Sequence, residues 1–385
     1  MSSNPVSPVI LQVLPSLVTG GVERGTVEIT QAIADTGWRA LVASQGGPMV
    51  EAVEHAGGHH IALPLKTKTP FGIWRNAARL EALIRAHNVS IVHARSRAPA
   101  WSAWLACQRT GTPFVTTYHG TYGETLPFKR RYNAIMARGE IVIAASHFIA
   151  ALVTARHGVD PSRIRVIPRG VDPIVFDPTA VPPERLARLT QAWRLPDGMR
   201  VVMLPGRLTA WKGHAVLLDA IARLKQANVV CVLVGSDQGR WRYSAQLRQR
   251  AEELRIGERL RMVGQCDDMP AAMMLADVVV HASTQAEAFG RVVIEAQAMG
   301  RPVVASDLGG PVETVAHGVT GLRIRPNDPG TLAAAIEQVL AMDVLERRAL
   351  SERARASVPT VQAMQQATID VYRTVLARWG RERAE

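Results

Sequence analysis

Short runs of β-branched and other apolar residues alternate along the chain with longer amphipathic stretches. This alternation is typical of βαβ units and parallel sheets. Most of the short runs are continuously apolar, as expected of strands that helices cover on both faces. In the first half, strands are predicted at Val9–Leu14, Ala40–Ser44, His60–Leu63, Val89–His93, Phe114–Tyr118, Ile141–Ala145 and Arg165–Ile167. Helices are expected between them at Val22–Thr36, Met49–Ala56, Ile73–His87 and Ala100–Arg109.

A second series of the same kind follows a proline-rich break. Residues 172–183 hold four prolines, and residues 194–199 add another proline and a glycine. The pattern predicts an α/β protein with a first doubly wound domain over residues 1–175, a linker over 176–199 and a second domain over 200–360. Ligands of such sheets bind at the carboxyl ends of the strands, so we expect a cleft where the two domains face each other. The second-series strands are expected at Val201–Leu204, Val229–Val234, Arg259–Val263, Val278–Ala282, Pro302–Ser306 and Leu322–Ile324.

Composition excludes several classes of protein. The 385 residues are 47% hydrophobic, which is typical of a globular chain, and no apolar run approaches the ~20 residues of a membrane-spanning helix. No basic segment precedes the first apolar stretch, so no secretory signal is expected. Cys107, Cys231 and Cys266 are scattered without metal-ligand spacing. We therefore expect neither a disulfide scaffold nor a zinc site, and a cytoplasmic location.

The net charge of +12 is unevenly distributed. Residues 1–175 contain 18 basic and 10 acidic residues, and residues 176–385 contain 27 and 23, so the first half carries +8 and the second +4. A basic surface suits nucleic acid, an anionic lipid or a phosphorylated substrate. No zinc-finger spacing, RNP-like aromatic motif or basic-region heptad is present, so a nucleic-acid partner is not expected.

Two loops that follow predicted strands carry candidate phosphate-binding residues. In PSLVTGGVERG, Gly20 and Gly21 stand where a helix N-terminus can approach a phosphate, although any strand-to-helix turn can use glycine. In LPGRLTAWKG, Arg207 and Lys212 lie five residues apart, an arrangement that suits a diphosphate. Two solvated loop cations would give the same pattern.

A third segment, STQAEAFGRVVIEAQAMG, carries two glutamates with seven residues between them. Glu287 is expected in the loop after a strand, and Glu295 in the second turn of a helix that begins near Gly290. Two carboxylates beside free backbone amides can bind sugar hydroxyls and a phosphate together. Both glutamates as ordinary solvated residues remain the alternative.

These segments, taken in order, resemble a known family. GGVER, YHG, GRLTAWKG, EAFGRVVIE and the later Gly309–Gly310 with Glu313 resemble the retaining glycosyltransferases of family 4, and EAFGRVVIE matches their E-x7-E motif. The resemblance implies the GT-B fold, with two Rossmann-like domains that face a central cleft. It also implies that the first domain binds the acceptor and the second the nucleotide sugar, and that a final helix, Val361–Trp379 within residues 361–385, returns to the first domain.

The resemblance implies roles for the residues of the second domain. Arg207 and Lys212 would hold the donor diphosphate, and Glu295 the ribose hydroxyls. Glu287 would face the donor sugar, with the amides around Phe289–Gly290 close to it.

In the first domain, Gly20 and Gly21 would contact the distal phosphate, and His119 matches the active-site histidine of the family. Ser146 and Arg169 are weaker candidates. Arg169 stands in IPRGVD where the family usually has asparagine in PNGVD, so its role is open.

The implied reaction needs no cofactor beyond the nucleotide sugar as co-substrate. No two aspartates are separated by a single residue, so the DxD metal motif is absent and we expect no metal site. Two cations can stabilise the departing diphosphate instead. We expect retention by front-face displacement, with double displacement through Glu287 as the alternative. A sugar-nucleotide epimerase of the same fold and a non-catalytic sugar-nucleotide-binding protein are the rival functions.

Basic residues of the first domain suggest where an acceptor or a membrane would bind. They cluster at Arg95 and Arg97, and at Lys129, Arg130 and Arg131 with Arg138. Within residues 127–138, four apolar residues recur at helical spacing, which suits either the surface of an anionic bilayer or packing on the domain's own sheet. We expect a glycan, glycolipid or phosphorylated acceptor, such as a lipopolysaccharide-core precursor, presented at the inner face of the membrane.

Overall fold

The computed structural model describes residues 7–18, 20–124 and 127–382, and the chain divides into two compact units. Unit 1 comprises residues 1–168 and 361–385, and unit 2 comprises residues 169–360. Among the described helices, none combines the length and apolar character that a membrane crossing requires.

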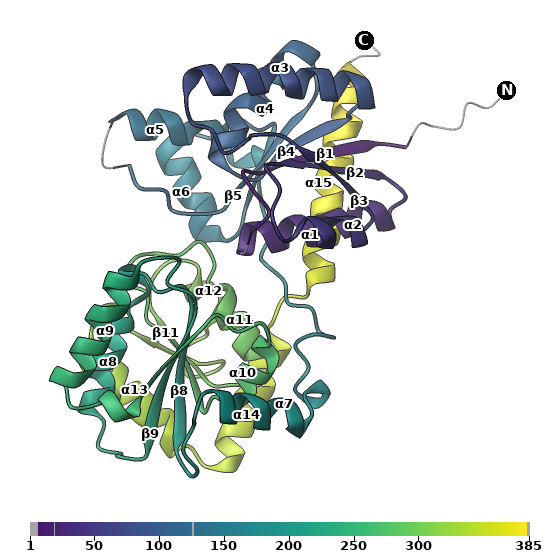
Figure 1. The fold of residues 1–385 in the computed structure, drawn as a ribbon. Coiled ribbons are helices and arrows are strands. Elements are labelled where there is room, and N and C mark those ends of the chain that lie inside the picture. Colours follow the sequence, from purple (N-terminus) through teal and green to yellow (C-terminus); the bar gives the residue numbers. More distant parts are fainter. Residues whose placement is uncertain (1–6, 19, 125–126, 383–385) are drawn as a thin grey trace. The chain divides into compact units, whose positions relative to one another are not determined.

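The described part of unit 1 contains a seven-stranded parallel sheet with the order β3-β2-β1-β4-β5-β6-β7 (Figure 1). The central strands are buried along their whole length, as their continuously apolar sequences predict. Each predicted strand is present, with ends that differ by at most two residues. The strands are β1 (Val9–Val13), β2 (Arg39–Ser44), β3 (Gly58–Ala62), β4 (Ile91–Ala94), β5 (Phe114–Tyr118), β6 (Ile141–Ala144) and β7 (Ile164–Val166).

The helices of unit 1 begin and end where local chemistry predicts. In α3, the Thr69 side chain accepts a hydrogen bond from the Gly72 amide, and Pro70 occupies the first turn, where no intrahelical N–H partner is needed. Both α3 and α4 begin three residues before the predicted start, because prolines are compatible with a first turn. The helices are α1 (Gly21–Asp35), α2 (Val50–His55), α3 (Pro70–His87), α4 (Arg97–Thr110), α5 (Pro127–Asn133), α6 (His147–His157) and α15 (Val361–Glu382), with 3-10 turns η1 (Ala134–Ala137) and η2 (Pro161–Arg163).

The last helix, α15, packs on the sheet of unit 1, although about two hundred residues separate it from the rest of that unit (yellow in Figure 1). Met364, Ile369 and Val375 of α15 share a buried cluster with Ile10 of β1 and Ile91 of β4. Burying one such side chain stabilises the folded state by roughly 1.5–3 kcal/mol relative to leaving it exposed. The expectation that the final helix returns to the first domain is confirmed.

The described part of unit 2 contains a six-stranded parallel sheet with the order β10-β9-β8-β11-β12-β13. On one face of this sheet, side chains of β8, β9 and β11 pack against helices in a single buried cluster. The strands are β8 (Arg200–Pro205), β9 (Val229–Val234), β10 (Leu260–Gly264), β11 (Val278–His281), β12 (Val303–Ser306) and β13 (Leu322–Ile324). The helices are α7 (Pro183–Ala192), α8 (His214–Arg223), α9 (Trp241–Glu253), α10 (Met269–Leu275), α11 (Arg291–Ala298), α12 (Pro311–Thr314), α13 (Pro329–Ala341) and α14 (Val344–Ala356), with 3-10 turns η3 (Pro178–Ala180), η4 (Ala210–Lys212) and η5 (Gly257–Arg259).

The stretch predicted as a linker, residues 176–199, belongs to unit 2 instead. It contains helix α7, whose Arg185 pairs with Asp268 at the start of α10. The proline-rich sequence therefore marks a short helix that contacts α10 of unit 2, and the two units divide at 168/169, before the predicted boundary at 175. Both prolines at 182 and 183 occupy the start of α7, where proline favours helix initiation.

Candidate functional site

The loop after β8 carries both predicted cations of unit 2. It ends at Gly213, whose φ of +78° lies in the left-handed region, and a Cβ built there would lie 1.8 Å from the Ala282 carbonyl oxygen at the end of β11. Only glycine tolerates both constraints. The close approach fixes Lys212 beside the carboxyl end of β11, and the Thr284 amide donates to the Trp211 carbonyl at 2.8 Å.

Lys212 and Glu287 form an ion pair in this site. Lys212 Nζ donates to Glu287 Oε1 at 2.6 Å, and their side chains are only 12% and 13% exposed. The same carboxylate oxygen lies 2.8 Å from His281 Nε2 and accepts a hydrogen bond from the Ser283 hydroxyl. Three side chains from the end of β11 and the β8 loop thus converge on one oxygen of Glu287.

The surroundings of Glu287 determine its protonation. Burial by itself raises the pKa of the carboxyl, but the charges and hydrogen bonds of His281 and Lys212 outweigh burial and hold the pKa well below its usual range. Glu287 is therefore a carboxylate at neutral pH, fixed in orientation by its partners.

A glycine pair supports the loop that carries Glu287. Gly310 donates its amide to the Glu287 carbonyl at 2.9 Å, and a Cβ at Gly309 would lie 2.5 Å from the same carbonyl oxygen. Gly290, with φ +81°, then starts α11, and a Cβ there would lie 2.7 Å from Pro311 Cγ. These contacts bring the first turn of α11 beside Glu287, as predicted, with Phe289 buried.

The second glutamate of the pair lies in α11. Glu295 is 5% exposed, and its Oε1 accepts from Arg291 Nε at 3.0 Å. It occupies the second turn of a helix that starts at Arg291, as expected. Arg207, in contrast, is exposed, and no hydrogen bond or ion pair of its side chain is present within the described ranges.

A cavity of about 290 Å³ adjoins the β8 loop at the carboxyl ends of β9 and β10. Gly235 permits the close approach of the two loops, because a Cβ there would lie 2.0 Å from the Gly206 carbonyl oxygen. The cavity is lined by Leu208, Gly235, Ser236, Asp237, Trp241, Ser244, Arg248, Met262, Gly264 and Gln265.

The predicted residues of unit 1 lie at the carboxyl edge of its sheet. Gly20 caps the N-terminus of α1 and Gly21 is its first residue; a Cβ at Gly21 would meet no atom within 4 Å, so the helix start adjoins open space. His119 directly follows β5, and its amide donates to the Tyr122 hydroxyl at 3.4 Å. Ser146 caps α6, where its hydroxyl accepts from the Ile149 amide at 3.1 Å.

Comparison with known proteins identifies the family. A model of group 1 glycosyl transferases matches residues 187–357, and one of glycosyltransferase family 4 matches residues 19–174. The D-inositol 3-phosphate glycosyltransferase of Jonesia denitrificans is 31% identical over 303 residues, which cover 72% of this chain and 69% of that protein. The chain belongs to glycosyltransferase family 4.

Solved structures agree with the GT-B fold of this glycosyltransferase. A glycosyltransferase from Rickettsia africae is 34% identical with a TM-score of 0.89 and covers 96% of this chain and 99% of its own. The Anabaena protein HepE, solved in complex with UDP-glucose, is 26% identical with a TM-score of 0.84, and the match covers 95% of this chain and 99% of that one. The predicted fold class is confirmed.

Two basic residues that we expected on an acceptor or membrane surface of the glycosyltransferase, Arg95 and Arg97, are buried or half-buried. Arg95 is 2% exposed, and burial lowers its pKa although Tyr372 and Glu28 oppose that shift. It directly follows β4 and interacts electrostatically with Tyr372 of α15 and Glu28 of α1, so it is a buried residue and not a surface one. Arg97 is half-buried, stacks on the Tyr122 ring at 4.1 Å and donates to Asn133 Oδ1 at 2.7 Å.

The amphipathic stretch over residues 127–138 also differs from a membrane helix. It divides into α5 and the 3-10 turn η1, and Ile135 and Met136 are fully buried. Its apolar residues therefore pack mainly on the unit's own sheet, as one of our two alternatives expected, and Phe128 alone of the four stays 64% exposed. Lys129, Arg130 and Arg131 are exposed.

Sequence reasoning missed His281 and Ser283, which hold Glu287. A signal was present: a histidine ended an otherwise all-valine strand, six residues before the glutamate. It was weak, because a lone histidine at a strand end is more often structural. The cavity at Gly235 and Trp241 was also missed, because its residues come from three separate connections.

Proposed function

We propose that this glycosyltransferase moves a hexose-type sugar from a nucleoside-diphosphate sugar to an acceptor hydroxyl, with retention of the anomeric configuration and without a metal ion. The observation that carries the proposal is the Lys212–Glu287 pair beside the exposed Arg207. It combines a fixed cation, an exposed cation and a fixed carboxylate at the ends of β8 and β11.

This charge arrangement fits the transition state of glycosyl transfer. Breaking the sugar–phosphate bond builds positive charge on the sugar and negative charge on the departing diphosphate. Arg207 and Lys212 would stabilise the diphosphate, and the ionised Glu287 would stabilise the sugar. Preorganised charges of this kind are usually the largest contribution to catalysis.

The hydrogen bonds of Glu287 favour front-face displacement over a covalent intermediate. An oxygen that already accepts from Lys212, His281 and Ser283 is a weaker nucleophile than a free carboxylate. We propose that the departing phosphate takes the proton of the acceptor hydroxyl, so that the new glycosidic bond forms on the face from which the phosphate leaves. Glu287 then supports the sugar electrostatically.

The donor nucleotide would occupy the cavity beside the β8 loop. Glu295 on α11 would bind the ribose hydroxyls, and the nucleoside would enter the cavity of about 290 Å³ beside Gly235 and Trp241. The UDP-glucose complex of the HepE relative supports a nucleotide-sugar donor. We propose that Gly20, Gly21 and His119 contribute from unit 1.

The acceptor that we propose first is a phosphorylated cyclitol or sugar. Relatives from Jonesia denitrificans and Mycobacterium tuberculosis, each 31% identical, are D-inositol 3-phosphate glycosyltransferases. Structures linked to lipopolysaccharide synthesis are 20% and 16% identical, a likeness that extends to the fold alone. The excess of basic residues in the first half also suits a phosphorylated acceptor.

The experiment is a panel of nucleotide sugars incubated with and without D-inositol 3-phosphate, inositol and lipid-linked acceptors. We expect nucleoside diphosphate release to accelerate with a phosphorylated acceptor, and an α-linked product from an α-linked donor by NMR. An epimerised nucleotide sugar without acceptor would identify an epimerase, and no release from any donor would identify a binding protein.

Treatment with EDTA tests the role of metal separately. We expect the rate of nucleoside diphosphate release to stay unchanged, because two cations already face the leaving group. A complete loss that Mg²⁺ or Mn²⁺ restores would contradict metal independence.

We also propose a cytoplasmic location, with contact at the inner face of the membrane where the acceptor is lipid-linked. Binding to anionic vesicles at low salt tests that contact.

A further inference from the structure

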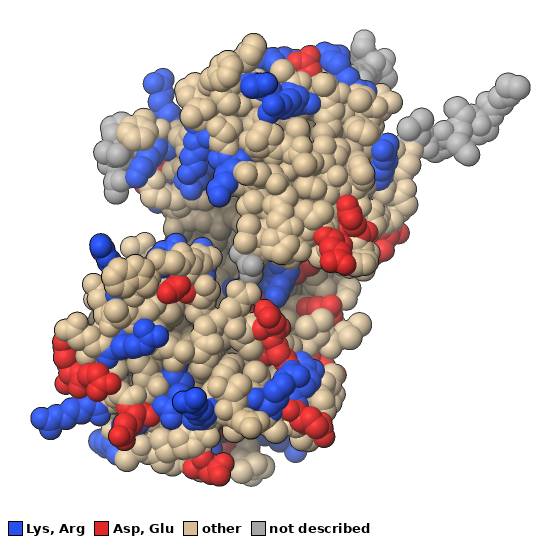
Figure 2. Space-filling model, in the orientation of Figure 1, with Lys and Arg blue, Asp and Glu red and all other residues tan. Residues whose placement is uncertain are grey.

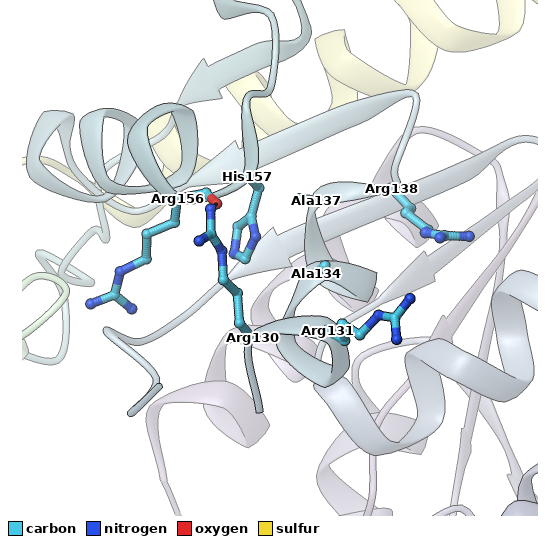
Figure 3. A pocket seen from close by; sticks show the side chains of 7 residues that line it. All are labelled: Arg130, Arg131, Ala134, Ala137, Arg138, Arg156 and His157. Atoms are coloured by element: carbon cyan, nitrogen blue, oxygen red, sulfur yellow. Dashed lines mark hydrogen bonds between the residues drawn. The ribbon is translucent and has the colours of Figure 1, made fainter. Parts of the chain in front are cut away.

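Unit 1 contains a strongly basic cavity, which includes Arg130, Arg131 and Arg138 of the cluster predicted from the sequence. It has a volume of about 370 Å³ and lies between α5 and the C-terminal end of α6 (Figure 3). Among the described residues no acidic side chain lines it. The lining consists of Arg130, Arg131, Ala134, Ala137, Arg138, Arg156 and His157.

The cavity lies away from the catalytic edge of unit 1. Helix α6 starts just after Ser146 at the carboxyl end of β6, and His157 is its last residue. An α-helix of 11 residues is about 16 Å long. Arg138 precedes β6, on the amino-terminal side of the sheet, whereas Gly20 and His119 lie at the carboxyl side. The lining is still connected to that side, because Arg156 donates to the carbonyls of Thr121 and Tyr122, which follow His119 in the chain.

Main-chain carbonyls hold two of the arginines in place. Arg130 Nη2 donates to the Arg156 carbonyl at 2.7 Å. Arg156 Nη1 in turn donates to the Thr121 and Tyr122 carbonyls at 2.6 and 2.9 Å. A neutral carbonyl fixes a guanidinium without cancelling its charge, so both cations stay available to an anion.

The other two arginines extend toward one side of the cavity in Figure 3. The Arg138 guanidinium stacks over Trp104 at 4.4 Å, which orients it and again leaves the charge intact. Arg131 is exposed, and its side chain makes no hydrogen bond or ion pair with any part of the chain that the structure describes. Figure 2 shows Lys and Arg gathered around α5, while acidic side chains of unit 1 concentrate around α1 and α2.

One carboxylate approaches this group of cations. Glu124 Oε1 lies 3.9 Å from both Arg156 Nη1 and His157 Nε2. Burial lowers the pKa of His157, and Arg130 and Arg156 lower it further, although Glu124 opposes them. The buried His157 is therefore neutral near pH 7, and a nearby anion would make its protonation easier.

We infer that this cavity binds a phosphate group through the forked guanidinium donors of Arg130, Arg131 and Arg138. Planar arginine forks match phosphate oxygens, and the lining offers several of them around a small alanine floor. The phosphate can belong to an anionic lipid headgroup or to a soluble phosphorylated compound. The two cations that we propose for the donor diphosphate, Arg207 and Lys212, belong to unit 2 and do not line this cavity.

The test uses the full-length protein and inorganic phosphate at constant ionic strength. Ring resonances of His157, assigned with the variant His157→Gln, are followed by NMR during the titration. We expect saturable shifts and a higher pKa of His157 with phosphate bound. The same shifts should occur in Arg207→Ala, which removes a cation of the candidate donor loop.

A pair of neighbouring variants separates the cavity from general surface charge. Arg131→Gln removes a lining cation that has no structural contact, and Lys129→Gln removes one from the same helix that does not line the cavity. We expect Arg131→Gln to weaken phosphate binding roughly tenfold, the effect of losing a charge-assisted hydrogen bond. Lys129→Gln should weaken it less than about twofold, as a solvated charge would.

Vesicles then distinguish the two sources of phosphate. If phosphatidylcholine vesicles with phosphatidylglycerol shift His157 and pure phosphatidylcholine vesicles do not, the ligand is a headgroup. If inorganic phosphate shifts His157 and neither vesicle does, it is a soluble compound. No shift of His157 with phosphate, equal weakening by Lys129→Gln and Arg131→Gln, or a shift that Arg207→Ala abolishes would each overturn the inference.

Discussion

The two units hold their functional charges in different ways. In unit 2, Lys212 and Glu287 lie 2.6 Å apart, and both side chains are mostly buried. In unit 1, Arg130 and Arg156 are held by carbonyl oxygens, and Arg131 is solvated. The charge of Lys212 in unit 2 is thus largely neutralised by Glu287, while Arg130, Arg131 and Arg156 of unit 1 keep their charge for an external partner.

The difference has consequences for both stability and binding. Removing one member of a buried pair leaves the other charge desolvated and unpaired, which is costly. Removing a solvated cation changes stability little, but it reduces the attraction for an anion. The same type of substitution should therefore affect folding in one unit and ligand binding in the other.

The largest effect is expected for the cations of the β8 loop. Lys212→Ala and Arg207→Ala should each lower kcat for donor turnover by roughly 10²–10³, because we propose that both stabilise the departing diphosphate. Lys212→Ala should also reduce the free energy of unfolding by about 3–5 kcal/mol, since it leaves Glu287 unpaired. Arg207→Ala should not. If urea unfolding shows that both variants are destabilised equally, the difference between a paired Lys212 and a solvated Arg207 is contradicted.

The next effect concerns the pH dependence of unit 2. His214 is fully buried directly after Gly213; burial lowers its pKa to about 4, and the charge of Lys212 contributes. Between pH 6.5 and 4 the unfolded chain binds a proton that the folded chain does not, so stability falls as the pH drops through this window. A difference between 6.5 and about 4 corresponds to roughly 3 kcal/mol.

Urea unfolding at pH 7 and pH 4 measures this decrease in the free energy of unfolding. In the variant His214→Gln the contribution of His214 to the decrease should be absent. Glu287 affects stability mainly below pH 4.5, because its pKa is lowered from that value, so the two windows are separable. A His214 ring resonance that titrates near pH 6.5 would contradict the prediction.

A smaller effect is expected for Glu295. Glu295→Ala should weaken the binding of a nucleoside diphosphate by about 1.5–3 kcal/mol, the range for hydrogen bonds to a charged group. Calorimetric titration with UDP and GDP measures it. Arg291→Gln is the matched control, because it removes the partner of Glu295 and keeps the carboxylate. Wild-type affinity in Glu295→Ala would remove this residue from the donor site.

The smallest effect belongs to unit 1. Tyr372→Phe removes the hydroxyl that lies 2.7 Å from His93 Nδ1 inside the core. The free energy of unfolding should fall by about 1 kcal/mol, as for one buried hydrogen bond. The rate of donor hydrolysis without acceptor should stay unchanged, because the charged residues that we propose for the donor site lie in unit 2. A loss of hydrolysis would show that α15 influences the donor site.

The sequence alone predicted the strands, most helices and the motif residues, because these depend on local chemistry. Runs such as Val229–Val234 are apolar throughout and need no tertiary information to indicate a buried strand. The E-x7-E segment likewise specifies a loop glutamate and a helical one, since the spacing from Gly290 fixes the turn that carries Glu295.

Only the tertiary structure decided which charges are accessible and which are compensated. The sequence suggests that Arg95 is a surface arginine, yet it is buried and interacts electrostatically with Tyr372, more than 260 positions away in the chain. Ile135 and Met136 suit a bilayer and a protein core equally well, and the sheet beneath them determines the outcome. Burial and pairing depend on what packs against a side chain, and a long-range contact leaves no pattern in the residues around it.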